Sequence, residues 1–350
     1  MKKMRKERVW FKTGYIIAFL LFVMAAIIPA TAAGQEASWP KSISILSKGA
    51  GGYSYPIAVA MCRVIEKNMG ISCAVEPVAG SMAQLELLRA KKAEFTLSVP
   101  NVEMWNAYYQ KGYWVGKPID IRMIMTEVPT WLTFIVRADS KIYSIKDLAG
   151  KVVWDRLTGS TSMALFSDGS YEIFGVKGKV KSIKFSQLQE IIDALKEKRA
   201  DAIHWPLTEG TAVIAELATT IGIRFLPIEA KEAKELERKY PFFRPSVLPA
   251  NTYKGQDKDV PMAVMTHGVV TTLDQPESFV YAVTKTLLEH HNEYAAAHKY
   301  GRCYGIKTYF DDPIIPYHPG CIKYYKEKGV WGKKQDEVQK KLLAEMGKIK

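Results

Sequence analysis

The sequence predicts an α/β protein of two lobes with a ligand site in the cleft between them. Three observations indicate this fold. Apolar strand patterns alternate with amphipathic helix patterns, which is typical of parallel strands covered by helices. About 318 of the 350 residues remain once the first 32 are set aside, and that length is long for one hydrophobic core. Turns rich in glycine and hydroxyl groups also follow several expected strands, at the sheet edge where ligands of open α/β sheets bind.

The first 32 residues have the composition of an export signal. Six Lys or Arg residues accompany the apolar stretch 15–28, and Ala30-Thr31-Ala32 supplies the small residues of a cleavage site. We expect cleavage near Ala32 and a soluble periplasmic protein. An uncleaved membrane anchor is the alternative, although the apolar stretch is shorter than the roughly 20 residues of a spanning helix.

The net charge is positive and spread along the chain. The formal value of +13 falls to near +8 without the first 32 residues, which carry six Lys or Arg and one Glu. No basic and aromatic motif predicts a nucleic-acid partner. We expect the lysine-rich stretches to be solvated helices at 179–184, 323–334 and 340–350.

Two series of strand and helix patterns divide the chain into two lobes. In the first we expect strands at 42–46, 73–78, 95–99 and 121–126, with helices at 56–69, 80–91 and 102–110. After a strand at 132–137, the second has strands at 151–154, 202–204 and 223–227, with helices at 162–174, 187–198, 208–219 and 228–240. The remaining patterns predict a loop at 241–261, a strand at 264–272 and one long helix at 276–298. We therefore assign residues 33–136 and 262–350 to lobe 1 and 137–261 to lobe 2, with hinges at 137–143 and 241–261.

The turn at residues 48–56, Lys-Gly-Ala-Gly-Gly-Tyr-Ser-Tyr-Pro, is the strongest indication of a binding loop. It lies between a strand and a helix, so the free N–H groups of the helix N-terminus favour an anion. It lacks the Lys-Ser/Thr ending of a P-loop and the glycine spacing of a dinucleotide loop. Thr158-Gly159-Ser160-Thr161 and Ala79-Gly80-Ser81 repeat this arrangement, and each of the three could equally be a plain turn or a helix cap.

Four cysteines follow the expected cleavage site and could form two disulfides in an oxidising compartment. We expect Cys303 to pair with Cys321, because the two flank a loop-rich segment. Cys62 and Cys73 lie in a helix and the next strand, and a disulfide and two buried thiols remain equally open for them.

In chain order, a set of short motifs resembles the TAXI-type solute receptors of TRAP transporters. The motifs are Gly51-Gly52-Tyr53-Ser54-Tyr55-Pro56, Ala79-Gly80-Ser81, Asp147-Leu148-Ala149-Gly150-Lys151, Thr158-Gly159-Ser160-Thr161, Ala194-Leu195 with Ala200-Asp201-Ala202, Pro249-Ala250-Asn251-Thr252-Tyr253, and Tyr317-His318-Pro319-Gly320-Cys321-Ile322-Lys323-Tyr324-Tyr325-Lys326-Glu327. The resemblance covers about residues 42–331. It implies a periplasmic-binding-protein-like fold of type II, capture of a small organic anion (a dicarboxylate, an oxo-acid or a glutamate-like solute), and delivery to TRAP membrane permease subunits. Carried over by position, it implies ligand contacts at Gly52, Tyr53, Ser54, Tyr55, Ser81, Thr158, Gly159, Ser160 and Thr161.

Four further candidates come from topology and from departures from the family pattern. Asn101 and Trp205 each follow an expected strand, and Trp131 would supply a flat wall of the site. Arg156 lies where the family has small residues, and it would either hold a carboxylate in a bidentate way or form a surface salt bridge.

Two other functions share this cleft. A receptor that signals to a histidine kinase would need the same site, and the sequence does not separate it from a transport receptor. An enzyme would need one acid or base in the cleft, such as His204 or Asp155. The chain has neither an HExxH-like pair nor a GxSxG element, so we expect no enzymatic activity, no cofactor and no metal.

Overall fold

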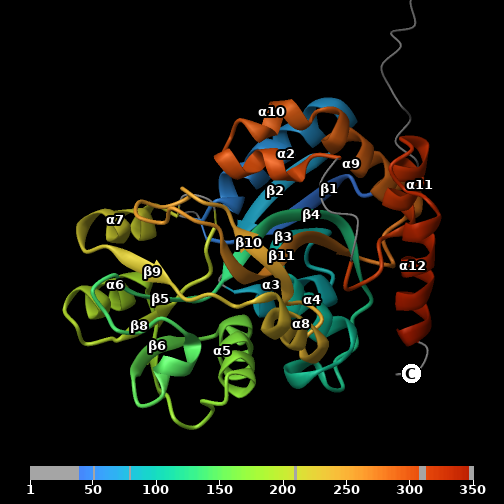
Figure 1. Ribbon diagram of the computed structural model, residues 1–350. Coiled ribbons are helices and arrows are strands. Elements are labelled where there is room, and N and C mark those ends of the chain that lie inside the picture. Colours follow the sequence, from blue (N-terminus) through green and yellow to red (C-terminus); the bar gives the residue numbers. More distant parts are fainter. Residues whose placement is uncertain (1–38, 50–51, 79, 209–210, 307–312, 347–350) are drawn as a thin grey trace, which may run out of the picture. The chain divides into compact units, whose positions relative to one another are not determined.

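The computed structural model describes residues 39–49, 52–78, 80–208, 211–306 and 313–346 (Figure 1). Every strand and helix named below lies within the unit Pro40–Lys350. The expected export signal lies outside the described residues. None of the helices in the described ranges has the length and apolar character needed to cross a membrane.

The first sheet is mixed and has six strands. Parallel pairs join β1 to β2 and to β3, whereas β11 runs antiparallel to β10 and β3 along one edge and to β4 along the other. The strands are β1 (Ser42–Ser47), β2 (Ser72–Pro77), β3 (Phe95–Pro100), β4 (Ile121–Leu132), β10 (Arg244–Leu248) and β11 (Val260–Thr272).

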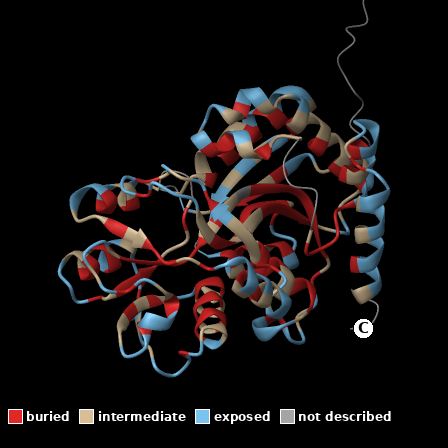
Figure 2. Ribbon diagram, in the orientation of Figure 1, coloured by how far each residue is buried: buried red, intermediate tan, exposed pale blue. Residues whose placement is uncertain are grey.

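Helices follow each of the parallel strands and cover the sheet because one face of each is apolar. In α2 (Ser54–Met69), which follows β1, Ile57, Met61 and Ile65 recur every four residues and are fully buried. Helices α3 (Ser81–Arg89) and α4 (Asn101–Tyr108) follow β2 and β3. Figure 2 shows the inner strands of this sheet largely buried, whereas the edge strands β2 and β10 are partly exposed.

The second sheet is smaller and has the strand order β7-β6-β8-β5-β9. Strand β6 is parallel to β7 and β8, whereas β5 is antiparallel to β8 and β9. The strands are β5 (Phe134–Arg137), β6 (Val152–Leu157), β7 (Lys181–Phe185), β8 (Ala202–His204) and β9 (Ile223–Phe225). Its helices are α5 (Thr161–Ile173), α6 (Leu188–Lys196) and α7 (Ala212–Thr220). Helix α8 (Ala230–Lys239) follows β9 and packs against α5 and against β10 of the first sheet.

The chain crosses between the sheets twice, at Thr133 and again at residues 226–228 after β9. The two crossings lie side by side. The first is Thr133, between β4 and β5, and its hydroxyl donates to the carbonyl of Leu226. The amide of Leu226 donates to the Phe134 carbonyl at 2.9 Å, and that of Ile228 to the Pro261 carbonyl at 2.8 Å. Adjacent crossings of this kind allow two lobes to rotate about one axis.

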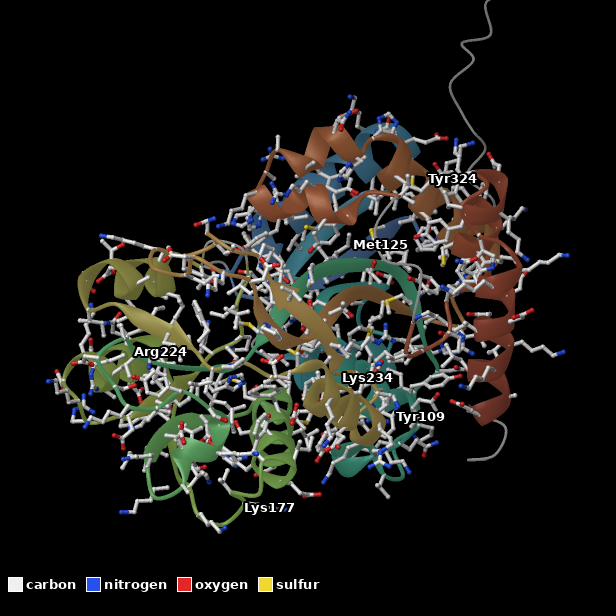
Figure 3. All side chains as sticks on the ribbon, in the orientation of Figure 1. Tyr109, Met125, Lys177, Arg224, Lys234 and Tyr324 are labelled. Atoms are coloured by element: carbon white, nitrogen blue, oxygen red, sulfur yellow. A yellow bond between two sulfur atoms is a disulfide. The ribbon has the colours of Figure 1, made fainter. Side chains whose placement is uncertain are left out.

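The expected hinge at 137–143 is fastened to β9 by Arg224, which Figure 3 labels. Its guanidinium donates to the carbonyls of Ala138 at 2.8 Å, Ser140 at 3.2 Å and Ile142 at 3.0 Å, and it lies over the Tyr143 ring. A segment tied to the second sheet by three such bonds moves with that sheet. Whether the expected hinges at 137–143 and 241–261 bend stays a prediction.

Most expected elements are confirmed, and three predictions are wrong. The segment 241–261 is not only a loop, because it contains β10, an edge strand that accommodates Pro245. The expected helix at 179–184 is largely the edge strand β7, where lysines protect an exposed edge. The expected long helix at 276–298 is two helices, α9 (Glu277–Glu289) and α10 (His291–Ala295), separated at His290.

The C-terminal part packs back on the first sheet. It contains the 3-10 helix η3 (Lys299–Tyr304) and the helices α11 (Pro319–Glu327) and α12 (Lys333–Met346). Helix α11 lies close against α9, because a Cβ at Gly320 would come 2.4 Å from the Glu277 carbonyl oxygen. The assignment of residue ranges to lobes 1 and 2 stays a prediction.

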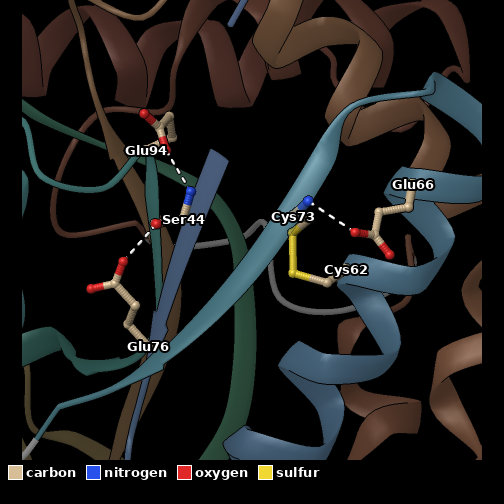
Figure 4. Close-up of a disulfide and its surroundings, with 6 residues drawn as sticks. All are labelled: Ser44, Cys62, Glu66, Cys73, Glu76 and Glu94. Carbon is tan, nitrogen blue, oxygen red and sulfur yellow. Dashed lines mark hydrogen bonds between the residues drawn. A yellow bond between two sulfur atoms is a disulfide. The ribbon is translucent and has the colours of Figure 1, made fainter. Parts of the chain in front are cut away.

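The disulfide joins Cys62 of α2 to Cys73 of β2 (Figure 4). The expected pairing of Cys303 with Cys321 is therefore wrong, and those two residues are thiols. Cys321 is fully buried, and its thiol donates to the His318 carbonyl at 3.0 Å. The short connection from α2 to β2 brings the Cα atoms of Cys62 and Cys73 to 5.1 Å, which is within the usual range for a disulfide.

Candidate ligand-binding site

The site is built at the carboxyl edge of β1, β2 and β3. Parallel strands end at the same edge, so the residues that follow them converge there. Lys48 follows β1, Ser81 begins the helix after β2, and Asn101 and Glu103 lie in the first turn of the helix after β3.

Lys48 is the cation of this edge. Its partly buried ammonium donates to the Ser81 hydroxyl and to Gln84 Oε1, the latter at 3.1 Å. Its backbone N–H donates to Ser54 Oγ at 3.2 Å. Burial lowers the pKa of Lys48 to about 8, against the opposing effect of the carboxylates of Glu103 and Glu127. The lysine therefore binds the two glycine turns of the first sheet to each other.

Glu127 of β4 is fully buried and accepts hydrogen bonds from three donors. They are the Ser98 amide at 2.6 Å, the Ser98 hydroxyl at 3.0 Å and the Tyr53 hydroxyl at 3.3 Å. Ser98 has φ = 58°, a left-handed conformation that is uncommon outside glycine. Burial raises the pKa of Glu127, while the donors favour its charged form.

An aromatic group from the C-terminal part of the chain closes this side. Tyr53 packs edge-to-face on Tyr300 of η3 with 5.3 Å between ring centroids, and His298 lies 6.1 Å from Tyr53. The Tyr300 hydroxyl donates to Oγ1 of Thr208, which follows β8. The Thr208 carbonyl also accepts from Tyr253 at 3.0 Å. Tyr300 thus connects the first sheet's residues to the second sheet.

The second sheet presents the N-terminus of α5 to this cluster. Ser160 caps the helix, since its hydroxyl accepts from the Met163 amide at 3.4 Å. Burial raises the pKa of Glu103, and the Thr161 hydroxyl and the charge of Lys48 oppose that shift. Thr161 at the start of α5 therefore acts on Glu103 in the first turn of α4, and the two helices are in contact.

Asn101 has a polar atom without a partner at the same edge. Its amide nitrogen donates to the Phe242 carbonyl at 2.9 Å. Its Oδ1 has no hydrogen-bond partner among the described residues, although the residue is only 3% exposed. Buried acceptors are usually satisfied, so this oxygen is suited to a donor from outside the chain.

The other expected site residues make contacts within or near the second sheet. Thr158 Oγ1 donates to the Phe185 carbonyl at 3.0 Å, and Gly159 supports the turn with φ = 78°. The Arg156 guanidinium holds Asp168 with two bonds of 2.6 and 3.1 Å, and it also donates to the Ala164 carbonyl. This is the salt bridge that the sequence left open as the alternative to a ligand contact.

The expected aromatic walls lie where the second sheet meets β4 and β10. Trp131 and Leu207 exchange two backbone hydrogen bonds of 2.8 Å, and the Trp131 indole donates to Ser246 Oγ at 3.2 Å. Trp205 is partly buried against the core of the second sheet, 6.4 Å from the Phe185 ring. Tyr55 and Gly52 are partly buried in the first turn. Whether these residues contact a ligand stays a prediction.

His204 and Asp155, the candidates for an enzyme, lie inside the second sheet's packing. His204 is fully buried against Phe166, and its Nδ1 lies 2.7 Å from the Thr133 carbonyl. Burial lowers its pKa to about 4. The Asp155 carboxylate accepts from Tyr171 at 2.6 Å. Across the described ranges, no group of three His, Cys, Asp or Glu side chains is arranged to hold a metal ion.

Sequence reasoning missed the charged centre of the site. Lys48 stands within the glycine turn that the sequence singled out, and Glu103 follows an expected strand by a few residues, so both carried a positional signal. Glu127 carried none, because it lies inside a long strand of the first sheet. Ser98, Tyr300 and Thr208 likewise join the cluster only through contacts between segments far apart in sequence.

Comparison with known proteins agrees with this architecture. A sequence model described as the NMT1-like family matches residues 45–329. The structure is similar to a TctC solute binding protein from Polaromonas, with a TM-score of 0.50 and 14% identity over 73% of this chain and 86% of that one. It is also similar to XAC2383 from Xanthomonas citri, solved with ATP and with a chloride ion. Those two matches have TM-scores of 0.52 and 0.51 and identities of 11% and 12%, and each covers 88% of this chain and 98% of that one. At these identities the similarity shows the fold, and it confirms the predicted two-lobed α/β fold of the periplasmic binding proteins.

Proposed function

Because the chain belongs to the NMT1-like family and its motifs resemble those of TAXI-type solute receptors, we propose that it is the extracytoplasmic receptor of a TRAP-type secondary transporter. It captures a small organic anion, of the dicarboxylate, oxo-acid or glutamate-like kinds that the sequence resemblance implies, in the cleft between its lobes. It then delivers the solute to the membrane permease subunits. Residues 1–32 direct export to the periplasm and are removed near Ala32.

The observation that carries this proposal is the group of polar residues around Lys48 at the carboxyl edge of the first sheet. Ser54 and Ser81 contact Lys48 directly, and Thr161 acts on Glu103 from the opposite sheet. A site assembled from two lobes, with a cation and hydroxyl groups at helix N-termini, suits an anion that is enclosed on closure. The unsatisfied Oδ1 of Asn101 would accept a donor from the solute.

Closure follows from the paired crossings at Thr133 and Leu226. The Tyr300 to Thr208 bond and the Thr161 to Glu103 approach join the two sheets on the site side. Opening of the two lobes breaks these polar contacts. A bound solute stabilises the closed form further, because it bridges polar groups of the two lobes. The receptor therefore offers the permease a closed, loaded form that differs from its open form.

A thermal-shift screen of residues 33–350 tests the receptor function. The purified protein is first unfolded and refolded to remove any solute that copurifies, and then mixed with small carboxylates, amino acids and neutral sugars. A solute at a hundredfold excess over its Kd raises the free energy of unfolding by about 2.7 kcal/mol. We expect an organic anion to raise the Tm, and a response to neutral sugars alone would overturn the proposal.

A matched pair of variants tests the place of binding. Thr161→Val removes the hydroxyl that approaches Glu103 without removing the Ser160 cap, so we expect weaker binding and little change in the Tm of the free protein. Thr219→Val, in the exposed face of α7, is the control and should bind as the parent does. Uptake into proteoliposomes that contain the permease should then require both the receptor and an ion gradient.

A further inference from the structure

The charged side chains described at the site, Lys48, Glu103 and Glu127, are not joined to one another in direct ion pairs. Lys48 contacts two neutral side chains, Ser81 and Gln84, and among the described residues no carboxylate forms an ion pair with its ammonium. Gln84 is itself fully buried and fixed, since its amide nitrogen donates to the Leu97 carbonyl at 3.2 Å. The ammonium is thus held by neutral acceptors and keeps its positive charge available to an anion.

The two carboxylates are stabilised by dipoles instead of cations. Glu127 receives the amide and hydroxyl of Ser98 and the hydroxyl of Tyr53. Glu103 lies in the first turn of α4, where the helix dipole favours a negative charge, and it faces Thr161 at the start of α5. The Thr161 hydroxyl at the start of α5 therefore already favours the charge of a carboxylate of the protein.

The other cation that the sequence singled out is already engaged within the protein. Arg156, the other candidate, is bound to Asp168 and to the Ala164 carbonyl. A solute with two carboxylates would pair one with Lys48 and bring the other near Glu103 and Glu127. Like charges in a poorly solvated site repel strongly, so the second carboxylate lowers the affinity.

Resting on the proposed function, we propose that the cleft selects a solute with one anionic group, which Lys48 binds, and discriminates against dicarboxylates. Among the kinds of solute considered above, monocarboxylic oxo-acids and other monocarboxylates fit these charges. Lys48 acts as the residue that pairs with the carboxylate, and Glu103 acts as the residue that excludes a second one.

Isothermal titration with matched pairs of acids tests this selection. The pairs are propionate with malonate, butyrate with succinate, and valerate with glutarate, which differ within each pair only in the second carboxylate. We expect the monocarboxylate to bind at least about tenfold more tightly in the pair that fits the cleft, a difference of about 1.4 kcal/mol. Tighter binding of the dicarboxylate would overturn the selection and leave the receptor function standing.

Three variants separate the roles of the two charged residues. Lys48→Met should abolish binding of the monocarboxylate and Lys48→Arg should retain part of it, because only the second keeps a cation. Glu103→Gln should raise the affinity for succinate relative to that for butyrate, because it removes the charge that repels the second carboxylate. A Tm measurement on each free variant shows that it is folded. Unchanged affinity in folded Lys48→Met would overturn the inference, whereas failure of every anion in the screen would overturn the receptor function as well.

Discussion

The Ser98 amide donates a 2.6 Å hydrogen bond to Glu127, and this bond joins β3 to β4 across the intervening strand β11. Ser98 adopts φ = 58° to make it. A left-handed residue inside a strand is held only where the surrounding contacts favour it, and here the contact is a fully buried carboxylate.

We predict that Glu127→Gln lowers the Tm. The amide of glutamine places a donor where the carboxylate accepts from Ser98 and Tyr53, so at least one buried donor loses its acceptor, which costs about 1–3 kcal/mol. Thermal unfolding followed by circular dichroism measures the change. Ser98→Gly is the matched variant, because it keeps the amide donor and suits the left-handed backbone, and it should cost less. Equal Tm values for Glu127→Gln and the parent protein would contradict this role.

The titration of Lys48 makes the free energy of unfolding depend on pH in the alkaline range. Its pKa is lowered to about 8 in the folded protein and is 10.5 in the unfolded chain, so between these values the unfolded chain binds the proton that the folded protein has lost. The free energy of unfolding therefore rises as the pH increases from about 8 to about 10.5, and the full cost of burying the charge is present below about pH 8.

Urea unfolding of the parent protein and of Lys48→Met across this range measures the effect. The variant lacks the buried charge, so its stability relative to the parent should be greatest near neutral pH and should decline as the pH rises. Lys231→Met, an exposed lysine of α8, is the control and should follow the parent throughout. Parallel curves for the parent and Lys48→Met would show that Lys48 does not titrate in this range.

The Cys62–Cys73 disulfide should stabilise the first lobe. The bridged residues are 11 apart in sequence, and closing a loop of this size in the unfolded chain is worth about 2–3 kcal/mol. The double variant Cys62→Ser with Cys73→Ser should lose that amount in denaturant unfolding. Thiol titration of the denatured, unreduced protein should find the two thiols of Cys303 and Cys321, and a count of four or none would contradict the pairing.

Gly320 sets the distance between α11 and α9. A Cβ at this position would lie 2.4 Å from the Glu277 carbonyl oxygen and 2.7 Å from the Tyr281 nitrogen, and both are backbone atoms that cannot rotate away. Gly320→Ala should therefore push the helices apart and lower the stability by about 1–3 kcal/mol, as overpacking typically does. Gly332→Ala, whose nearest neighbour would be a side-chain atom at 3.6 Å, should leave the Tm almost unchanged. Equal effects of the two substitutions would contradict this account.

Local patterns were sufficient for the order of most strands and helices. The apolar spacing of Ile57, Met61 and Ile65 marks α2, and the glycine turn before it marks the end of β1, because both features depend on a few neighbouring residues. The same reasoning failed at β7 and β10. These edge strands are held by their partners β6 and β11, and a lysine-rich or proline-containing stretch has no local signal for such pairing.

The sequence by itself determined that the chain alternates strands with helices and that polar turns end its parallel strands. These properties follow from backbone conformation and from the spacing of apolar residues along short segments. Only the tertiary structure decided which charges share the site. Lys48 and Glu127 are 79 positions apart in sequence and act on each other only after β1 and β4 enter one sheet. It also decided that Arg156 is bound to Asp168 and that Cys62 pairs with Cys73, because distances between side chains depend on packing, which no local pattern records.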